Sequence, residues 1–179
     1  KLSRKQIFEG FLGEVTSDIS TLDFIHIVIP HFSWIYLPDG RSYENHRISV
    51  KFPWKTQTLA DEVYHRYLMQ VGYVDKMVGD LVSRLKESGK YDDALVIIVA
   101  DHGYGFQQGM TGRDISKEPA VLHIPLFVKY PRQKKGVINE KYVYNIDVVP
   151  TIADVLNVEL PWSVDGESLL DETPRKDPI

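Results

Sequence analysis

Apolar side chains recur at helical spacing in three stretches of this chain. Residues 4–15 repeat them every three or four positions, and residues 145–158 do the same near the end of the chain. The longest pattern runs over about 59–85, where one apolar face is formed by Val63, Tyr67, Val71, Val74, Val78, Leu81 and Leu85. Thr58 is expected to cap the start of this long helix and Gly89 its end.

Three apolar runs favour buried strands. They are "DFIHIVIPH" over 23–31, "ALVIIVA" over 94–100 and "HIPLFVKY" over 123–130, and continuous apolar runs are typical of a sheet covered on both faces. Strand, helix, strand, loop, strand, helix predicts an α/β layered fold with a largely parallel sheet. The length of 179 residues is enough for one core, so we expect 1–179 to form a single domain.

A long irregular segment over 32–56 separates the first strand from the long helix. It carries many aromatic side chains, namely Phe32, Trp34, Tyr36, Tyr43, Phe52 and Trp54. Loops of this length inside a domain are often functional. The aromatic side chains can be interpreted as part of the fold core or a lid, which is the simpler interpretation, or as a surface for a partner.

Composition excludes several classes of function. The net charge is −4 and the isoelectric point about 5.9, which gives no electrostatic case for binding nucleic acid. The short basic stretch of Arg132, Lys134 and Lys135 lies between Pro131 and Gly136 and is interpreted as a solvated turn. The chain has no cysteine, which removes disulfides, thiolate metal sites and a cysteine nucleophile, and no run approaches a membrane span.

Candidate ligands stand where two of the predicted strands end. One strand ends in Pro30-His31 and another in Asp101-His102, and the carboxyl ends of strands in one sheet meet at one edge. Aspartate and neutral histidine bind zinc, manganese and similar ions, which can polarise a phosphoryl or sulfuryl oxygen. On spacing alone, however, Asp-His-Gly is more simply a turn and His31 a loop histidine.

A cationic side chain follows in the loop after Asp101-His102. Arg113 lies near Gly109 and Gly112, and a guanidinium beside a metal would suit a tetrahedral oxyanion. The sequence equally allows Arg113 to be a solvated loop cation paired with Asp114. His26 lies inside a predicted strand and is interpreted as a structural histidine.

Four motifs occur together in an informative order. "LVIIVADHG", "HIPLFVKYP" and "NIDVVPTIADVLNVELPWSVDGESLL", preceded by "IHIVIPHFSWIYLP", resemble the sulfatase-like hydrolases of the alkaline phosphatase superfamily, in the C-terminal half of their catalytic domain. The resemblance spans about 22–171 and implies a three-layer α/β sandwich. It further implies that Asp101 and His102 ligate one divalent metal ion (Ca, Mn, Zn or Mg) and that His31 contacts sulfate or phosphate oxygens. Asp147 and Gly166 are implied to be structural.

The chain also departs from that family pattern. It has no "C/S-x-P-x-R" signature, and the glycine-bearing loop lacks the histidine and lysine that many sulfatases have there. We therefore expect residues 1–179 to be the C-terminal portion of a larger catalytic domain, truncated on its N-terminal side, with the nucleophile outside this chain. The isolated chain is accordingly expected to be inactive, and the missing N-terminal part of the same polypeptide is its expected partner.

The resemblance implies a metal-dependent hydrolase of sulfuric or phosphoric esters. His31 and Arg113 are the catalytic candidates, and the expected substrate is a small-molecule, glycan-linked or lipid-linked sulfate or phosphate ester. Relatives often act outside the cytoplasm, which implies an extracytoplasmic domain of a membrane-tethered parent. Two alternatives stay open: a phosphoglycerol or phosphoethanolamine transferase, and a non-catalytic binding domain on the same fold.

Overall fold

The computed structural model describes residues 2–15, 20–43, 52–114 and 121–172. The chain divides into two compact units, each of which takes two separate segments of sequence. Unit 1 comprises Lys1–Tyr91 and Gly103–His123, and unit 2 comprises Asp92–His102 and Ile124–Ile179. Each unit is described by itself below.

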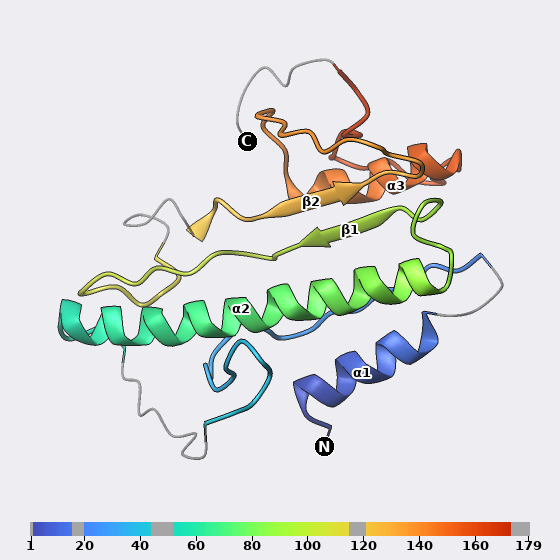
Figure 1. The fold of residues 1–179 in the computed structure, drawn as a ribbon. Coiled ribbons are helices and arrows are strands. Elements are labelled where there is room, and N and C mark those ends of the chain that lie inside the picture. Colours follow the sequence, from blue (N-terminus) through green and yellow to red (C-terminus); the bar gives the residue numbers. More distant parts are fainter. Residues whose placement is uncertain (1, 16–19, 44–51, 115–120, 173–179) are drawn as a thin grey trace. The chain divides into compact units, whose positions relative to one another are not determined.

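Two helices form the frame of unit 1, α1 (Arg4–Glu14) and α2 (Gln57–Glu87) (Figure 1). Both confirm the helices expected from apolar spacing. The side chain of Thr56, two residues earlier than predicted, caps α2 by accepting a hydrogen bond from the Leu59 amide at 3.2 Å. Gly89, at φ +72°, follows the last turn, a conformation that glycine adopts at little cost.

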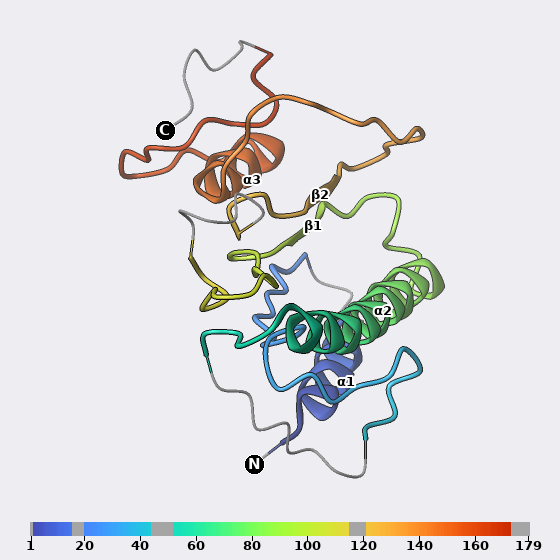
Figure 2. The same cartoon turned by 90° about the vertical axis from the view of Figure 1, so that its left-hand side faces the viewer.

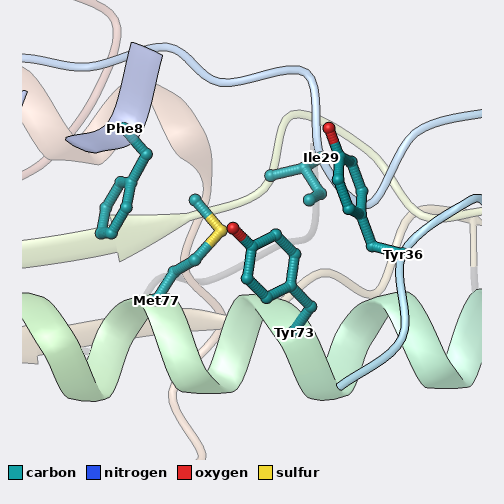
Figure 3. Close-up of a cluster of buried hydrophobic side chains, with 5 residues drawn as sticks. All are labelled: Phe8, Ile29, Tyr36, Tyr73 and Met77. Atoms are coloured by element: carbon teal, nitrogen blue, oxygen red, sulfur yellow. The ribbon is translucent and has the colours of Figure 1, made fainter. Parts of the chain in front are cut away.

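The first core of unit 1 lies between α1, α2 and the segment before residue 37. It consists of Phe8, Ile29, Tyr36, Tyr73 and Met77, which Figure 3 shows gathered above α2. The second view of the ribbon shows α1 alongside α2 at this core (Figure 2). The core thus joins three separate stretches of sequence.

The predicted strand over 23–31 is wrong for this structure. Its side chains do alternate, because Ile25, Ile27 and Ile29 turn toward the first core while Phe24 and Val28 are exposed. A strand also needs a hydrogen-bonded neighbour, however, and no segment of the described residues pairs with this one. The apolar pattern therefore gave the buried face correctly and the secondary structure incorrectly.

A second, aromatic core closes the other end of unit 1. Its buried members are Trp34, Trp54, Ala60, Val63 and Met110, with Phe32, Tyr67, Tyr104 and Phe106 packed against them. Trp34 and Trp54 are each only 1% exposed, whereas Phe52 is 43% exposed. Most aromatic side chains of the long irregular segment thus contribute to the core, as the simpler interpretation held.

The sheet of unit 2 differs from the prediction. Strands β1 (Val96–Val99) and β2 (Leu126–Lys129) are antiparallel, with Val96 opposite Lys129 and Val99 opposite Leu126. Parallel pairing needs a crossover connection, usually a helix, and the described part of the connection between β1 and β2 contains no α-helix. Within the described residues the sheet is therefore two-stranded, and the predicted largely parallel, three-layer arrangement is not seen there.

The end of unit 2 is held by a buried carboxylate. A 3-10 turn (Asn145–Asp147) leads into α3 (Val148–Leu156), and Asp147 accepts from the amides of Tyr144 at 2.8 Å and Glu167 at 2.9 Å. Thr151 adds a hydrogen bond from the Leu169 amide to its hydroxyl at 2.9 Å. Asp147 therefore has a structural role, as expected. Its carboxylate binds the Glu167 amide of the C-terminal segment, and its side chain does not cap α3.

Two smaller predictions concern charge and membranes. Arg132 and Lys134 form exposed ion pairs with Asp93 and Asp92, as expected of a solvated turn. Among the helices in the described part of the chain, none combines the length and apolar character that crossing a membrane requires.

Candidate functional site

His31 and Arg113 meet in unit 1. The guanidinium Nη2 of Arg113 lies 3.2 Å from Nε2 of His31, across 82 positions of sequence, and both side chains are exposed. The other ring nitrogen, Nδ1, lies 2.7 Å from the Phe32 carbonyl oxygen. Because that carbonyl can only accept, Nδ1 carries the proton and Nε2 accepts from Arg113 in this network. The two predicted catalytic residues are thus a hydrogen-bonded pair.

The loop that carries Arg113 is anchored on the aromatic core. The Trp54 amide donates to the Met110 carbonyl at 3.1 Å, and the Gly109 amide donates to the Trp54 carbonyl at 2.9 Å. The Gly105 amide then donates to the Gly112 carbonyl at 2.8 Å, which closes the loop immediately before Arg113. Gly112 has φ +86°, where residues with a side chain are strained.

The ring of Tyr104 packs against this loop at Gly112, and the sequence analysis did not identify this residue. Its ring occupies the space that a Cβ on Gly112 would need. Burial raises the pKa of Tyr104 to about 12, and the nearby positive charge of Arg113 lowers it in part. The phenol is therefore protonated and uncharged beside the guanidinium at neutral pH.

The backbone of His31 is held by Arg4 of α1. Arg4 donates through Nη1 to the His31 carbonyl at 3.0 Å and through Nη2 to the Phe32 carbonyl at 2.8 Å. Partial burial lowers the pKa of Arg4, and Tyr36 raises it in part. Sequence analysis interpreted this residue only as part of an amphipathic helix, because nothing in the local pattern links it to a turn so far along the chain.

Asp101 and His102 lie just beyond β1 in unit 2, after Ala100. The side-chain Nδ2 of Asn145 donates to the carbonyl oxygens of Ala100 at 3.1 Å and Asp101 at 3.4 Å, which holds the end of the strand. The Asp101 carboxylate accepts from the His102 amide at 2.9 Å, and its Oδ2 lies 3.7 Å from His102 Nε2. The side chain of Asp101 is 77% exposed and that of His102 is 28% exposed.

A carboxylate and an imidazole are suitable donors for a divalent metal ion. Within the residues that the structure describes, no group of three or more metal-ligating side chains occurs, and such sites use three or four protein ligands. The pair therefore fits part of a metal site in its donor chemistry and falls short in number. Convergence of this pair with His31 and Arg113 stays a prediction.

Comparison with known proteins gives consistent matches. The family model described as "Sulfatase" matches residues 6–158. The multifunctional alkaline phosphatase superfamily protein PehA of Trinickia caryophylli is 35% identical over 99 residues, covering 54% of this chain and 19% of its own length. Human N-sulphoglucosamine sulphohydrolase is 32% identical over 108 residues, covering 59% of this chain and 21% of its own.

A solved structure extends the similarity to the fold. The phosphonate monoester hydrolase of Silicibacter pomeroyi superposes with a TM-score of 0.58 at 27% identity, covering 94% of this chain and 29% of that one. This chain therefore spans about a fifth of the length of the two curated relatives and under a third of the solved structure.

Proposed function

This chain belongs to the sulfatase family of the alkaline phosphatase superfamily, and from that premise we propose that it is part of a hydrolase of sulfuric or phosphoric esters. The observation that carries the proposal is the hydrogen bond between His31 and Arg113 at 3.2 Å. It presents a guanidinium and an imidazole together on an exposed face, and these are the groups that bind the oxygens of a tetrahedral anion.

The proposed roles of the pair follow from its hydrogen bonding. Arg113 uses one N–H to reach His31, which leaves further N–H groups to donate to the oxygens of a sulfate or phosphate ester. His31 holds the guanidinium in place through Nε2 before substrate binds. Once Arg113 turns to the substrate and His31 is protonated, Nε2–H donates to an ester oxygen or to the leaving group.

Asp101 and His102 would hold a divalent ion, with Ca, Mn, Zn and Mg as the candidates. When bound, such an ion offsets charge on the ester oxygens and lowers the pKa of the nucleophile. The two donors are too few for a complete site in the described residues, and the relatives are about five times longer than the matched stretch. The relatives' greater length supports the proposal that residues 1–179 are one portion of a longer catalytic domain, and the order of the motifs supports a C-terminal position, with the nucleophile and the remaining ligands elsewhere in the polypeptide.

The proposed substrates are sulfate or phosphate esters of small molecules, glycans or lipids. The names of the relatives include both sulfur and phosphorus chemistry, since one is an N-sulphoglucosamine sulphohydrolase and another a phosphonate monoester hydrolase. Assays should therefore compare an aryl sulfate, an aryl phosphodiester and an aryl phosphonate ester side by side.

The test measures hydrolysis of these three esters by the full polypeptide. Arg113→Ala is expected to lower kcat by about 10²–10³-fold, in line with loss of a donor to a developing oxyanion. Arg132→Ala serves as the control, because its guanidinium is exposed and pairs with Asp93 in the unit 2 turn. Rates unaffected by Arg113→Ala or by a metal chelator would contradict the proposal, and release of an acceptor adduct in place of free acid would indicate a transferase. The isolated 179-residue chain is expected to show no turnover.

A further inference from the structure

The buried side-chain amide of Gln70, in the middle of α2, contacts the turn over residues 31–36. Gln70 is 0% exposed, and its neighbours on the same helical face are the core residues Tyr73 and Met77. A buried amide is costly unless its polar atoms are paired. Gln70 forms hydrogen bonds with the short turn that carries His31, which lies 39 positions earlier in the sequence.

The hydrogen bonds of Gln70 hold both ends of this turn. Its Nε2 donates to the His31 carbonyl at 3.0 Å. Its Oε1 accepts from the amides of Ile35 at 3.0 Å and Tyr36 at 3.2 Å. The backbone from 31 to 36 is thus clamped to α2 at its first and last residues. Figure 3 shows Tyr36, at the far end of the clamp, packed beside Tyr73 of the same helix.

The clamp determines how the His31 ring is placed. The His31 carbonyl accepts from both Gln70 and Arg4, each at 3.0 Å, so both of its lone pairs are used. The ring then bonds through Nδ1 to the Phe32 carbonyl inside the clamped turn. A ring fixed in this way directs Nε2 toward Arg113.

We propose that Gln70 is a positioning residue, which clamps the 31–36 turn so that the His31 imidazole meets Arg113 in one tautomer and one orientation. The proposal rests on the function proposed above for His31 and Arg113. Glutamine suits the task because one side chain must donate at one end of the turn and accept at the other. Glutamate cannot donate when ionised, lysine cannot accept, and asparagine is one methylene shorter.

Two substitutions separate the arms of the clamp. Gln70→Glu keeps an acceptor for the Ile35 and Tyr36 amides and removes the donor to the His31 carbonyl. Gln70→Met keeps the length of the side chain and removes all three hydrogen bonds. Leu85→Ala is the matched control, because Leu85 is buried at the far end of α2 and its loss lowers stability without touching the turn.

Three measurements apply to each variant. They are amide hydrogen exchange at Ile35 and Tyr36, ¹⁵N imidazole spectra of His31, and kcat and KM of the full polypeptide. For Gln70→Met, exchange at both amides is expected to accelerate roughly tenfold relative to Leu85→Ala, the equivalent of one lost hydrogen bond. For Gln70→Glu, the amides stay protected while His31 loses its preference for the Nδ1–H tautomer. The kcat of Gln70→Glu falls roughly 10- to 100-fold with KM little changed, as expected of a misplaced catalytic group.

The proposal is overturned if both Gln70 variants match Leu85→Ala in the His31 spectrum and in kcat. Should neither variant fold, Gln70→Asn keeps a side-chain amide that is one methylene too short to span the turn, and an unchanged His31 tautomer there would equally count against the clamp. Failure of the proposed function would give a different set of results. A wild-type kcat in His31→Ala would remove the catalytic role of His31, while a shifted tautomer in Gln70→Glu would still establish the clamp.

Discussion

Replacing Gly112 with alanine tests whether the ring of Tyr104 sets the position of Arg113. Gly112 has φ +86°, and a Cβ there would overlap the Tyr104 ring. Gly109, three residues earlier in the same loop, has nearly the same φ of +82° but no atom within 4 Å of where a Cβ would stand. Alanine at either position therefore incurs the backbone cost of a positive φ, and alanine at 112 also incurs a steric overlap with Tyr104.

The expected magnitudes follow from that difference. Gly109→Ala pays only for a left-handed backbone, about 1–2 kcal/mol. Gly112→Ala adds the overlap with a part-buried aromatic ring, and overpacking of this kind costs about 1–3 kcal/mol more. The free energy of unfolding should thus fall by about 2–5 kcal/mol for Gly112→Ala. In the full polypeptide, kcat should fall as well, because the displaced loop moves Arg113 away from His31.

Urea unfolding followed by tryptophan fluorescence measures both variants, since Trp34 and Trp54 lie in the core on which this loop packs. The double mutant Tyr104→Ala/Gly112→Ala completes the test. With the ring removed, alanine at 112 should cost no more than alanine at 109, measured against Tyr104→Ala alone. Equal losses in Gly112→Ala and Gly109→Ala, or no coupling in the double mutant, would refute the assigned role of the ring.

Three further predictions concern stability. Asp147→Ala removes the acceptor for the Tyr144 and Glu167 amides and should cost about 2–4 kcal/mol in urea unfolding, whereas the exposed Asp154→Ala should stay within about 0.5 kcal/mol. Burial raises the pKa of Tyr104 from 10.0 to about 12. The stability that the protonated Tyr104 side chain gives to the folded state is therefore fully present below pH 10 and is lost as the pH rises toward 12. After allowance for solvent screening this loss is about 1 kcal/mol, and it should vanish in Tyr104→Phe. Asp92→Asn breaks the exposed pair with Lys134 at 3.2 Å and should change the melting temperature little at any salt concentration, so a large shift would contradict the solvated-turn interpretation.

Apolar periodicity was sufficient to predict the helices. The pattern over about 59–85 corresponds to a helix of 57–87, because burial of one face dominates the stability of a long helix. Direction and pairing of strands were not predictable in the same way. The run over 94–100 does contain β1, but a strand's neighbour is chosen by the connection and by distant segments, and here β2 returns antiparallel.

The candidate site was predictable as residue types and not as contacts. His31 and Arg113 were identified by their positions at the end of a predicted strand and in a glycine-bearing loop, together with the family resemblance, yet their hydrogen bond joins residues 82 positions apart. Gln70 was missed although the sequence holds a signal for it. It is a polar residue on the apolar face that Val63, Tyr67 and Val74 define, and such an interruption indicates a buried amide with a specific partner.

The alternation of the two units along the chain bears on how the protein is synthesised. The aromatic core of unit 1 cannot close until Met110 has left the ribosome, which happens after all of β1 has been made. Strand β1 in turn cannot pair until β2 has been made, and synthesis from Val99 to Leu126 takes roughly 1–5 s at ordinary rates of translation. Until Met110 emerges, the nascent chain carries both an unpaired apolar strand and an open aromatic core, and this is the stage at which a chaperone would protect the most exposed apolar surface.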